Sequence, residues 1–128
     1  MYYVAGKALF LEGADMDLIR VYGGEDGESH FEALDPFTSH EWARTFAAQR
    51  CSINVFPAER IDTWHPAPRR QLVIHMAGRM EMELRDGTKH VFGPGSARLM
   101  EDVAGTTTGH FTRILGDETV VQAVIALE

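Results

Sequence analysis

Short runs of alternating apolar and polar residues, separated by turn residues, follow one another along this chain. In "RMEMELRDGTKHVF", residues 79–92, Met80, Met82 and Leu84 alternate with charged residues, so one face of a strand enters a core and the other meets water. Asp86–Gly87 supplies the positive φ angles of a two-residue type I′ turn, which predicts a hairpin. Further strands are predicted at residues 18–22, 51–56, 96–99, 110–115 and 119–127. Strands punctuated by turns at such short intervals are typical of an all-β sandwich or barrel.

One segment departs from this β pattern. In "TSHEWARTFAAQR", residues 38–50, Thr38 and Glu41 have the spacing of a capping box, and Trp42 and Phe46 lie four residues apart. These features predict a short helix near residues 39–49. The preceding "DPFTS" is equally compatible with an irregular loop, so the helix and the loop both remain open.

Length, charge and cysteine content narrow the class of protein. The 128 residues suffice for one domain with a real core, and no apolar run approaches the ~20 residues that span a bilayer. The N-terminal residues lack the basic region and cleavage site of a signal peptide, and the single cysteine suits a reducing cytoplasm. A net charge of −7 with dispersed basic residues argues against nucleic acid and anionic membranes as partners. We therefore expect a cytoplasmic protein that binds neither.

The stretch "WHPAPRRQLVIHMAG", residues 64–78, carries the candidate chemistry. Strand parity places Gln71 and His75 on one face, together with His65 and Ala67 if the pleat is unbroken through the prolines. Neutral imidazole is the commonest metal ligand in proteins, but a metal site needs several ligands that converge. From the residues alone, this is either a metal-site strand or a sheet edge that contains histidines.

The same stretch resembles the first motif of the cupin superfamily, H-x-H-x(3,4)-E-x(6)-G. His65 occupies the first histidine position, Ala67 the second, Gln71 the glutamate position and Gly78 the closing glycine. Residues 86–110, "DGTKHVFGPGSARLMEDVAGTTTGH", resemble the second cupin motif, with His110 at its late histidine. Together the two stretches look like small bacterial single-domain cupins, most of which have no assigned function.

This resemblance implies a fold and a domain organisation. The fold would be a double-stranded β-helix, the cupin jelly-roll barrel, with a pocket between its two sheets. A single cupin domain would cover residues 1–128, with the motif-bearing barrel core at about 51–127 and N-terminal strands and a loop in residues 1–50. A homodimer is also expected, because single-domain cupins commonly pair and a strand such as "VVQAVIAL" is an aggregation hazard when exposed.

The resemblance also implies a metal site, from which this chain departs. A full cupin site has three imidazoles and one carboxylate, whereas the matching positions here give His65, His110 and the neutral amide of Gln71. Without the carboxylate a divalent cation would be poorly neutralised, unless Glu101 or Asp102 supplies the charge. The implied cofactor is one divalent transition metal, Fe, Zn, Ni or Mn, held by these three side chains.

Three further side chains are predicted to contact a small-molecule substrate: His75, Arg70 and Trp64. His75 has the alternative of a core histidine satisfied by one hydrogen bond. Arg70 can bind a carboxylate substrate in a bidentate manner, or form a salt bridge to Glu101 or Asp102.

Three functions follow from these features. The first is a cupin that binds a small molecule in its pocket, with or without a metal. The second is a metal-dependent enzyme of the oxygenase, isomerase or lyase type. The third is a non-catalytic dimeric module with a degenerate metal site. Ala67 and Gln71 at ligand positions favour the first and third functions over the second.

Overall fold

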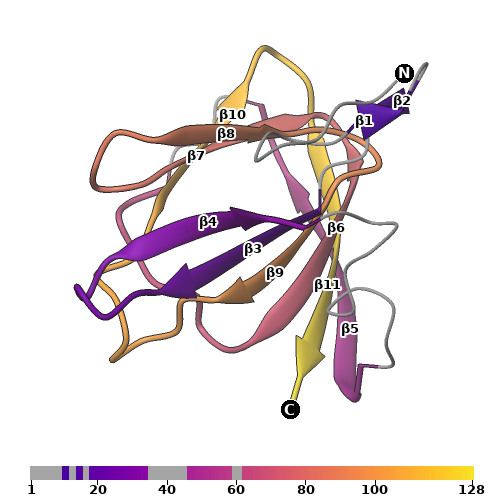
Figure 1. Ribbon diagram of the computed structural model, residues 1–128. Coiled ribbons are helices and arrows are strands. Elements are labelled where there is room, and N and C mark those ends of the chain that lie inside the picture. Colours follow the sequence, from indigo (N-terminus) through magenta and orange to yellow (C-terminus); the bar gives the residue numbers. More distant parts are fainter. Residues whose placement is uncertain (1–9, 12–13, 16–17, 35–45, 59–61) are drawn as a thin grey trace.

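The structure of this protein is a computed structural model that describes residues 10–11, 14–15, 18–34, 46–58 and 62–128 (Figure 1). All of the regular secondary structure in these ranges is β-strand. The strands are β1 (Phe10–Leu11), β2 (Ala14–Asp15), β3 (Leu18–Gly23), β4 (Ser29–Ala33), β5 (Ala48–Phe56), β6 (Gln71–Ala77), β7 (Arg79–Glu83), β8 (Lys89–Phe92), β9 (Ala97–Glu101), β10 (Phe111–Leu115) and β11 (Val120–Leu127).

Two sheets make up the barrel. The larger has the strand order β4-β3-β9-β6-β11-β5, and the smaller has the order β10-β7-β8. The pairing is antiparallel except between β3 and β9, and strands distant in sequence lie side by side, as in a jelly roll. In Figure 1 the small sheet lies across one end of the view and the large sheet curves beneath it. The predicted all-β jelly-roll fold is confirmed.

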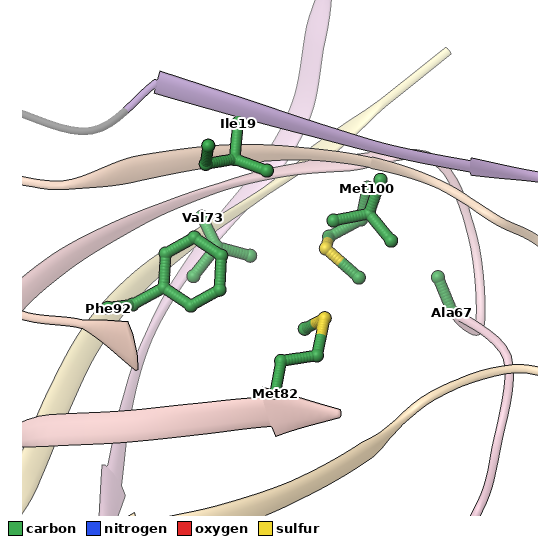
Figure 2. Packing of buried hydrophobic residues seen from close by; sticks show 7 residues of the cluster. Ile19, Ala67, Val73, Met82, Phe92 and Met100 are labelled. Carbon is green, nitrogen blue, oxygen red and sulfur yellow. The ribbon is translucent and has the colours of Figure 1, made fainter. Parts of the chain in front are cut away.

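The interior layer is built from both sheets. β3 contributes Ile19 and Val21, while Met82 and Phe92 come from the small sheet on the opposite side, and all four are buried (Figure 2). Burial of apolar surface of this kind stabilises a fold by roughly 25 cal/mol per Å². The core therefore joins the two sheets and fixes the space between them.

The hairpin between β7 and β8 follows the predicted alternation. Met80, Met82 and Leu84 are buried. The predicted two-residue turn is wrong, because the Leu84 N–H donates to the Thr88 carbonyl and the Gly87 N–H donates to the Leu84 carbonyl, each at 2.9 Å. The loop thus has three residues, and the last of them, Gly87, has a φ of 90°. A three-residue hairpin loop needs a left-handed residue after its turn, and glycine adopts that conformation readily.

The strand β6 alternates between the barrel interior and its outer face. Val73 and His75 are buried and Gln71 shares their parity, whereas Ile74 and Met76 are exposed on the outside. The predicted common face of Gln71 and His75 is therefore confirmed. Gly78 ends the strand with a φ of 73°, and a Cβ there would lie 2.5 Å from the Thr119 carbonyl oxygen, so this position requires glycine.

The predicted helix near residues 39–49 lies mainly outside the described residues. Its end does not: residues 46–47 have no regular structure, and Ala48 begins the strand β5, so helix is wrong there. Pairing of β5 along the whole of β11 accounts for the extended backbone. No helix in the described part of the chain is long and apolar enough to cross a membrane.

Candidate functional site

His65 and His110, 45 positions apart in the sequence, lie side by side. The His65 N–H donates to the His110 carbonyl at 2.9 Å, the reverse bond is 3.0 Å, and the ring centroids are 4.7 Å apart. Gly109 makes this close approach possible: its φ is 98°, and a Cβ there would collide with the His65 backbone. The local sequence "TGH" therefore brings the two imidazoles together.

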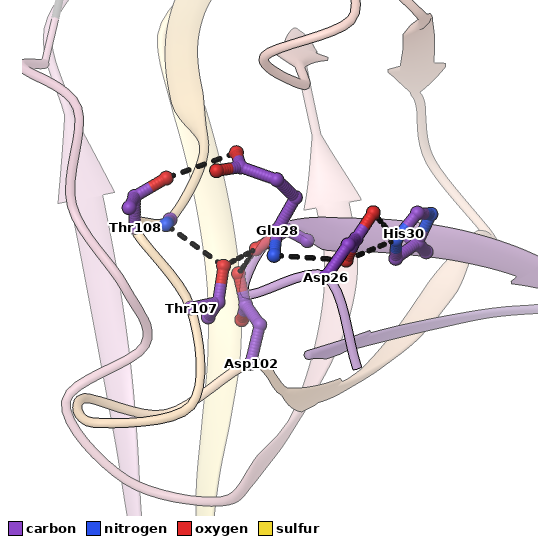
Figure 3. A network of polar contacts seen from close by, with 8 residues as sticks. Asp26, Glu28, His30, Asp102, Thr107 and Thr108 are labelled. Carbon is purple, nitrogen blue, oxygen red and sulfur yellow. Dashed lines mark hydrogen bonds and ion pairs between the residues drawn. The ribbon is translucent and has the colours of Figure 1, made fainter. Parts of the chain in front are cut away.

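A buried carboxylate orients the His110 ring. Asp102 is 0% exposed, and its Oδ2 accepts hydrogen bonds from His110 Nδ1 at 2.6 Å and from Ser29 Oγ at 2.7 Å. Thr107 extends this network, because its hydroxyl lies 2.8 Å from Ser29 Oγ and accepts the Gly109 N–H at 3.0 Å (Figure 3). Three segments of the chain thus fix one imidazole.

The hydrogen-bond partners of the two rings define which ring nitrogen carries the proton. His65 Nδ1 lies 2.6 Å from the Thr63 carbonyl, and a carbonyl only accepts, so Nδ1 carries the proton. His110 Nδ1 donates to Asp102 in the same way. In the neutral rings, both Nε2 atoms therefore keep a free lone pair, which can accept a proton, accept a hydrogen bond or bind a metal ion.

Both histidines line a cavity of about 220 Å³ between the two sheets. Gln71 and Ala67 line it too, so the residues at the four aligned motif positions His65, Ala67, Gln71 and His110 meet at one space. The remaining described lining residues are Asn54, Phe56, Asp62, Pro68, Val73, Met80, Met82, Arg98, Met100, Thr112, Gln122 and Val124.

Several buried polar atoms of the lining residues lack a hydrogen-bond partner in the described part of the chain. They are Oε1 of Gln71, Nε of Arg98 and Nε2 of Gln122. Arg98 is 6% exposed and its guanidinium carbon lies 4.9 Å from the ring centroid of Phe92. Burial lowers the pKa of Arg98 to about 10, against the opposing effect of the Asp102 carboxylate, so Arg98 is charged at neutral pH.

Sequence reasoning missed Arg98 and Gln122. The available signal was strand parity: Arg98 alternates with Leu99 in "ARLME", and Gln122 interrupts the apolar run "VVQAVIAL". A polar residue at an inward position of a strand lowers stability unless it has a hydrogen-bond partner. Such positions are therefore candidates for ligand contacts.

His75 is buried beside this site without being part of the cavity wall. It is 2% exposed and is paired across the sheet with Gln122. Burial, and to a smaller extent the charge of Arg98, lower the pKa of His75 to about 4 against the opposing effect of the Gly78 backbone. The ring is therefore neutral at neutral pH, and its predicted contact with a substrate stays a prediction.

Arg70 and Trp64 lie outside the cavity lining that the structure describes. Arg70 Nε donates to Glu101 Oε2 at 2.7 Å, which matches the salt-bridge alternative, and Arg20 Nε donates to the other oxygen at 2.5 Å. Trp64 packs against Phe111 with ring centroids 5.5 Å apart. Substrate contacts by Arg70 and Trp64 remain predictions.

The side chains at the cavity do not match the divalent metal that the resemblance implies. No three His, Cys, Asp or Glu side chains converge among the residues that the structure describes. Asp102 bonds to Nδ1 of His110 and Glu101 bonds to two arginines, so neither adds a ligand. Two imidazoles and an amide beside the charged Arg98 do not fit a divalent ion well, and the Asp62 carboxylate on the same wall does not converge with the two imidazoles. Binding of Fe, Zn, Ni or Mn stays a prediction.

Comparisons with known proteins add a likeness of fold only. No family model matches the chain, and no curated protein matches it. Among solved structures it is similar to the cupin domain of Cnp3 from Schizosaccharomyces pombe, with 12% sequence identity, a TM-score of 0.47, and coverage of 78% of this chain and 73% of that chain. No ligand or activity follows from this likeness. The strand order itself defines the class, a jelly-roll barrel with a polar cavity between its sheets.

Proposed function

We propose that this protein binds a small organic molecule in the cavity between its sheets and does not require a metal to do so. The observation that carries the proposal is the set of buried cavity atoms without partners, on Gln71, Arg98 and Gln122. Leaving a buried polar group unsatisfied costs about 1–3 kcal/mol, so a wall with several such groups favours an occupant that bonds to them.

The size of the cavity supports a small occupant. Its 220 Å³ equals about seven water molecules at ~30 Å³ each, and lies below the ~300–1,000 Å³ of pockets for drug-sized ligands. The wall is amphipathic: Val73, Met82 and Val124 offer apolar surface, while the amides, imidazoles and guanidinium offer hydrogen bonds. A compact molecule with polar groups at its ends matches this wall.

Native mass spectrometry of the untagged protein tests for a retained molecule, and thermal unfolding with small acids, amides, amines and alcohols tests for binding. Ala67→Phe fills the cavity, while Ala33→Phe, at the exposed end of β4, is the matched control. We expect retention or stabilisation in the unsubstituted protein and in Ala33→Phe, and its loss in Ala67→Phe. Equal behaviour of all three proteins, or no binding of any kind, would contradict the proposal and leave only water in the cavity.

A second candidate is catalysis by proton transfer. It is supported by the Asp102–His110 hydrogen bond, which resembles the way carboxylates orient a general base, and by the neighbouring His65 ring. In the metal-dependent form, which is an enzyme of the oxygenase, isomerase or lyase type, His65, His110 and Gln71 would hold the ion, and the ion would polarise a substrate oxygen or activate a water. Elemental analysis separates the two forms: a stoichiometric metal that is lost in a His65→Ala/His110→Ala variant would establish the metal-dependent form.

We also propose that the protein is a cytoplasmic homodimer that pairs through the outer face of β5, β11 and β6. This face carries exposed Ile53, Val55, Ile74 and Met76, and its outward positions in the three strands carry no Asp, Glu, Lys or Arg. With a net charge of −7, two copies meet with least repulsion at an uncharged surface. In addition, β5 pairs only with β11 among the described strands, so its other edge is open to a second β5.

A further inference from the structure

Arg98 is a charged side chain within the cavity wall that contacts no acid of the described chain. It is 6% exposed and its Nε has no hydrogen-bond partner there. Asp102, four residues along the chain, influences Arg98 through its charge, but its Oδ2 bonds to Ser29 and His110 instead. A buried cation is costly unless it is paired and hydrogen-bonded. An anion bound at the Arg98 guanidinium would therefore stabilise this arrangement.

The neighbours of Arg98 on the sheet add complementary groups. Arg98 is paired with Val73 of β6, and Val73 with Val124 of β11, so an apolar row lies beside it on the inner face. Gln71 is two residues from Val73, and Gln122 is two residues from Val124, which is about 6.6 Å along each strand. The unsatisfied Gln122 Nε2 is a donor and the unsatisfied Gln71 Oε1 is an acceptor.

We propose that the cavity takes a small organic acid whose carboxylate is bound by Arg98, an inference that rests on the proposed small-molecule function. The planar guanidinium matches a carboxylate with two parallel hydrogen bonds, and these bonds are strong at a side chain as buried as Arg98. Gln71 accepts a hydrogen bond from a hydroxyl or amine of the ligand, and Gln122 donates one to an oxygen. The apolar row contacts its carbon skeleton.

The alternative role for Arg98 is to neutralise Asp102 without any ligand. In that case the two side chains are expected to make a salt bridge, which gives a buried pair its best compensation. The structure instead gives Oδ2 of Asp102 two other partners, and it leaves both Oδ1 of Asp102 and Nε of Arg98 without a described partner, so the two side chains make no salt bridge. The two roles differ in whether removal of Arg98 changes the binding of an acid.

The test compares acids with amides of almost the same shape: benzoate with benzamide, and butyrate with butyramide. Calorimetric titrations, with and without EDTA, are run on the unsubstituted protein, on Arg98→Gln, on Arg98→Lys and on Arg113→Gln. Arg113 is the matched control, because its guanidinium is paired with Glu81 and Glu83 of β7. We expect acids to bind more tightly than amides, and Arg98→Gln to weaken acid binding by roughly 10- to 100-fold. Arg98→Lys should fall between, and Arg113→Gln should have no effect.

Three results would overturn the inference: equal affinity for acid and amide, unchanged acid affinity in Arg98→Gln, or no binding of any acid at millimolar concentration. Loss of acid binding on addition of EDTA would assign the carboxylate to a metal and would also overturn it. The proposed function fails separately, when native mass spectrometry finds no retained molecule and no probe of any charge binds. If Arg98→Gln does not fold, the comparison of acid with amide on the unsubstituted protein still tests whether the cavity prefers a carboxylate.

Discussion

Protonation of the buried His75 should destabilise the fold in mild acid. The pKa of His75 is lowered from 6.5 to about 4 by burial and by the charge of Arg98. Between these two values the unfolded chain binds a proton that the folded chain does not, so stability falls as the pH falls from about 6.5 to about 4. The shift of 6.5 − 4 = 2.5 at ~1.36 kcal/mol per pKa unit corresponds to a loss of about 3 kcal/mol at the acid end of this range.

Urea unfolding at a series of pH values measures this loss, in the unsubstituted protein and in His75→Leu, which keeps an apolar side chain and cannot be protonated. Carboxylates also titrate in this range, but they do so in both proteins, so the difference between the two curves isolates His75. His30→Asn is a control on a histidine that is paired with Asp26 at the surface. If His75→Leu loses stability with falling pH as steeply as the unsubstituted protein, the claim that His75 is buried as a neutral imidazole is refuted.

Three further predictions concern stability and assembly. Asp102→Ala should lower the free energy of unfolding by about 3–5 kcal/mol in urea titrations, because Ser29 and His110 then lose their buried hydrogen-bond acceptor. A change below about 1 kcal/mol contradicts this prediction. Gly109→Ala should cost more than Gly105→Ala, since both have positive φ but only Gly109 approaches other backbone; equal costs contradict this. Sedimentation should show a dimer at micromolar concentration that Ile53→Glu dissociates, and a monomeric unsubstituted protein would remove the proposed interface.

Local sequence patterns predicted many of the strands and part of the site. Alternation in residues 79–92 identified the hairpin and its buried face, because the period of two follows directly from strand geometry. The length of its turn did not follow, since Asp86–Gly87 is compatible with a two-residue loop and with the observed three-residue loop. The position of β5 was found in part, as its first residues resemble a helix end and become strand by pairing with β11.

The site depended on contacts between distant segments, which sequence spacing does not report. The meeting of His65 and His110 was expected from the resemblance to two motifs, and the structure shows the rings adjacent. Asp102 was considered as a source of negative charge for an ion, whereas it bonds to Nδ1 of His110. Arg98 was missed because strand parity marks its position without showing what it faces, whereas the pairing of β9 with β6 places its side chain at the cavity.

The resonance of the Arg98 Nε–H group reports most directly on the central claim that this cavity binds a small acid. Titration of ¹⁵N-labelled protein with benzoate in EDTA is followed at this group, with benzamide as the matched neutral probe. We predict a saturable shift of the Arg98 signal with benzoate and a much smaller one with benzamide, and neither in Ala67→Phe. An Arg98 signal that stays in place as benzoate reaches millimolar concentration would contradict the account.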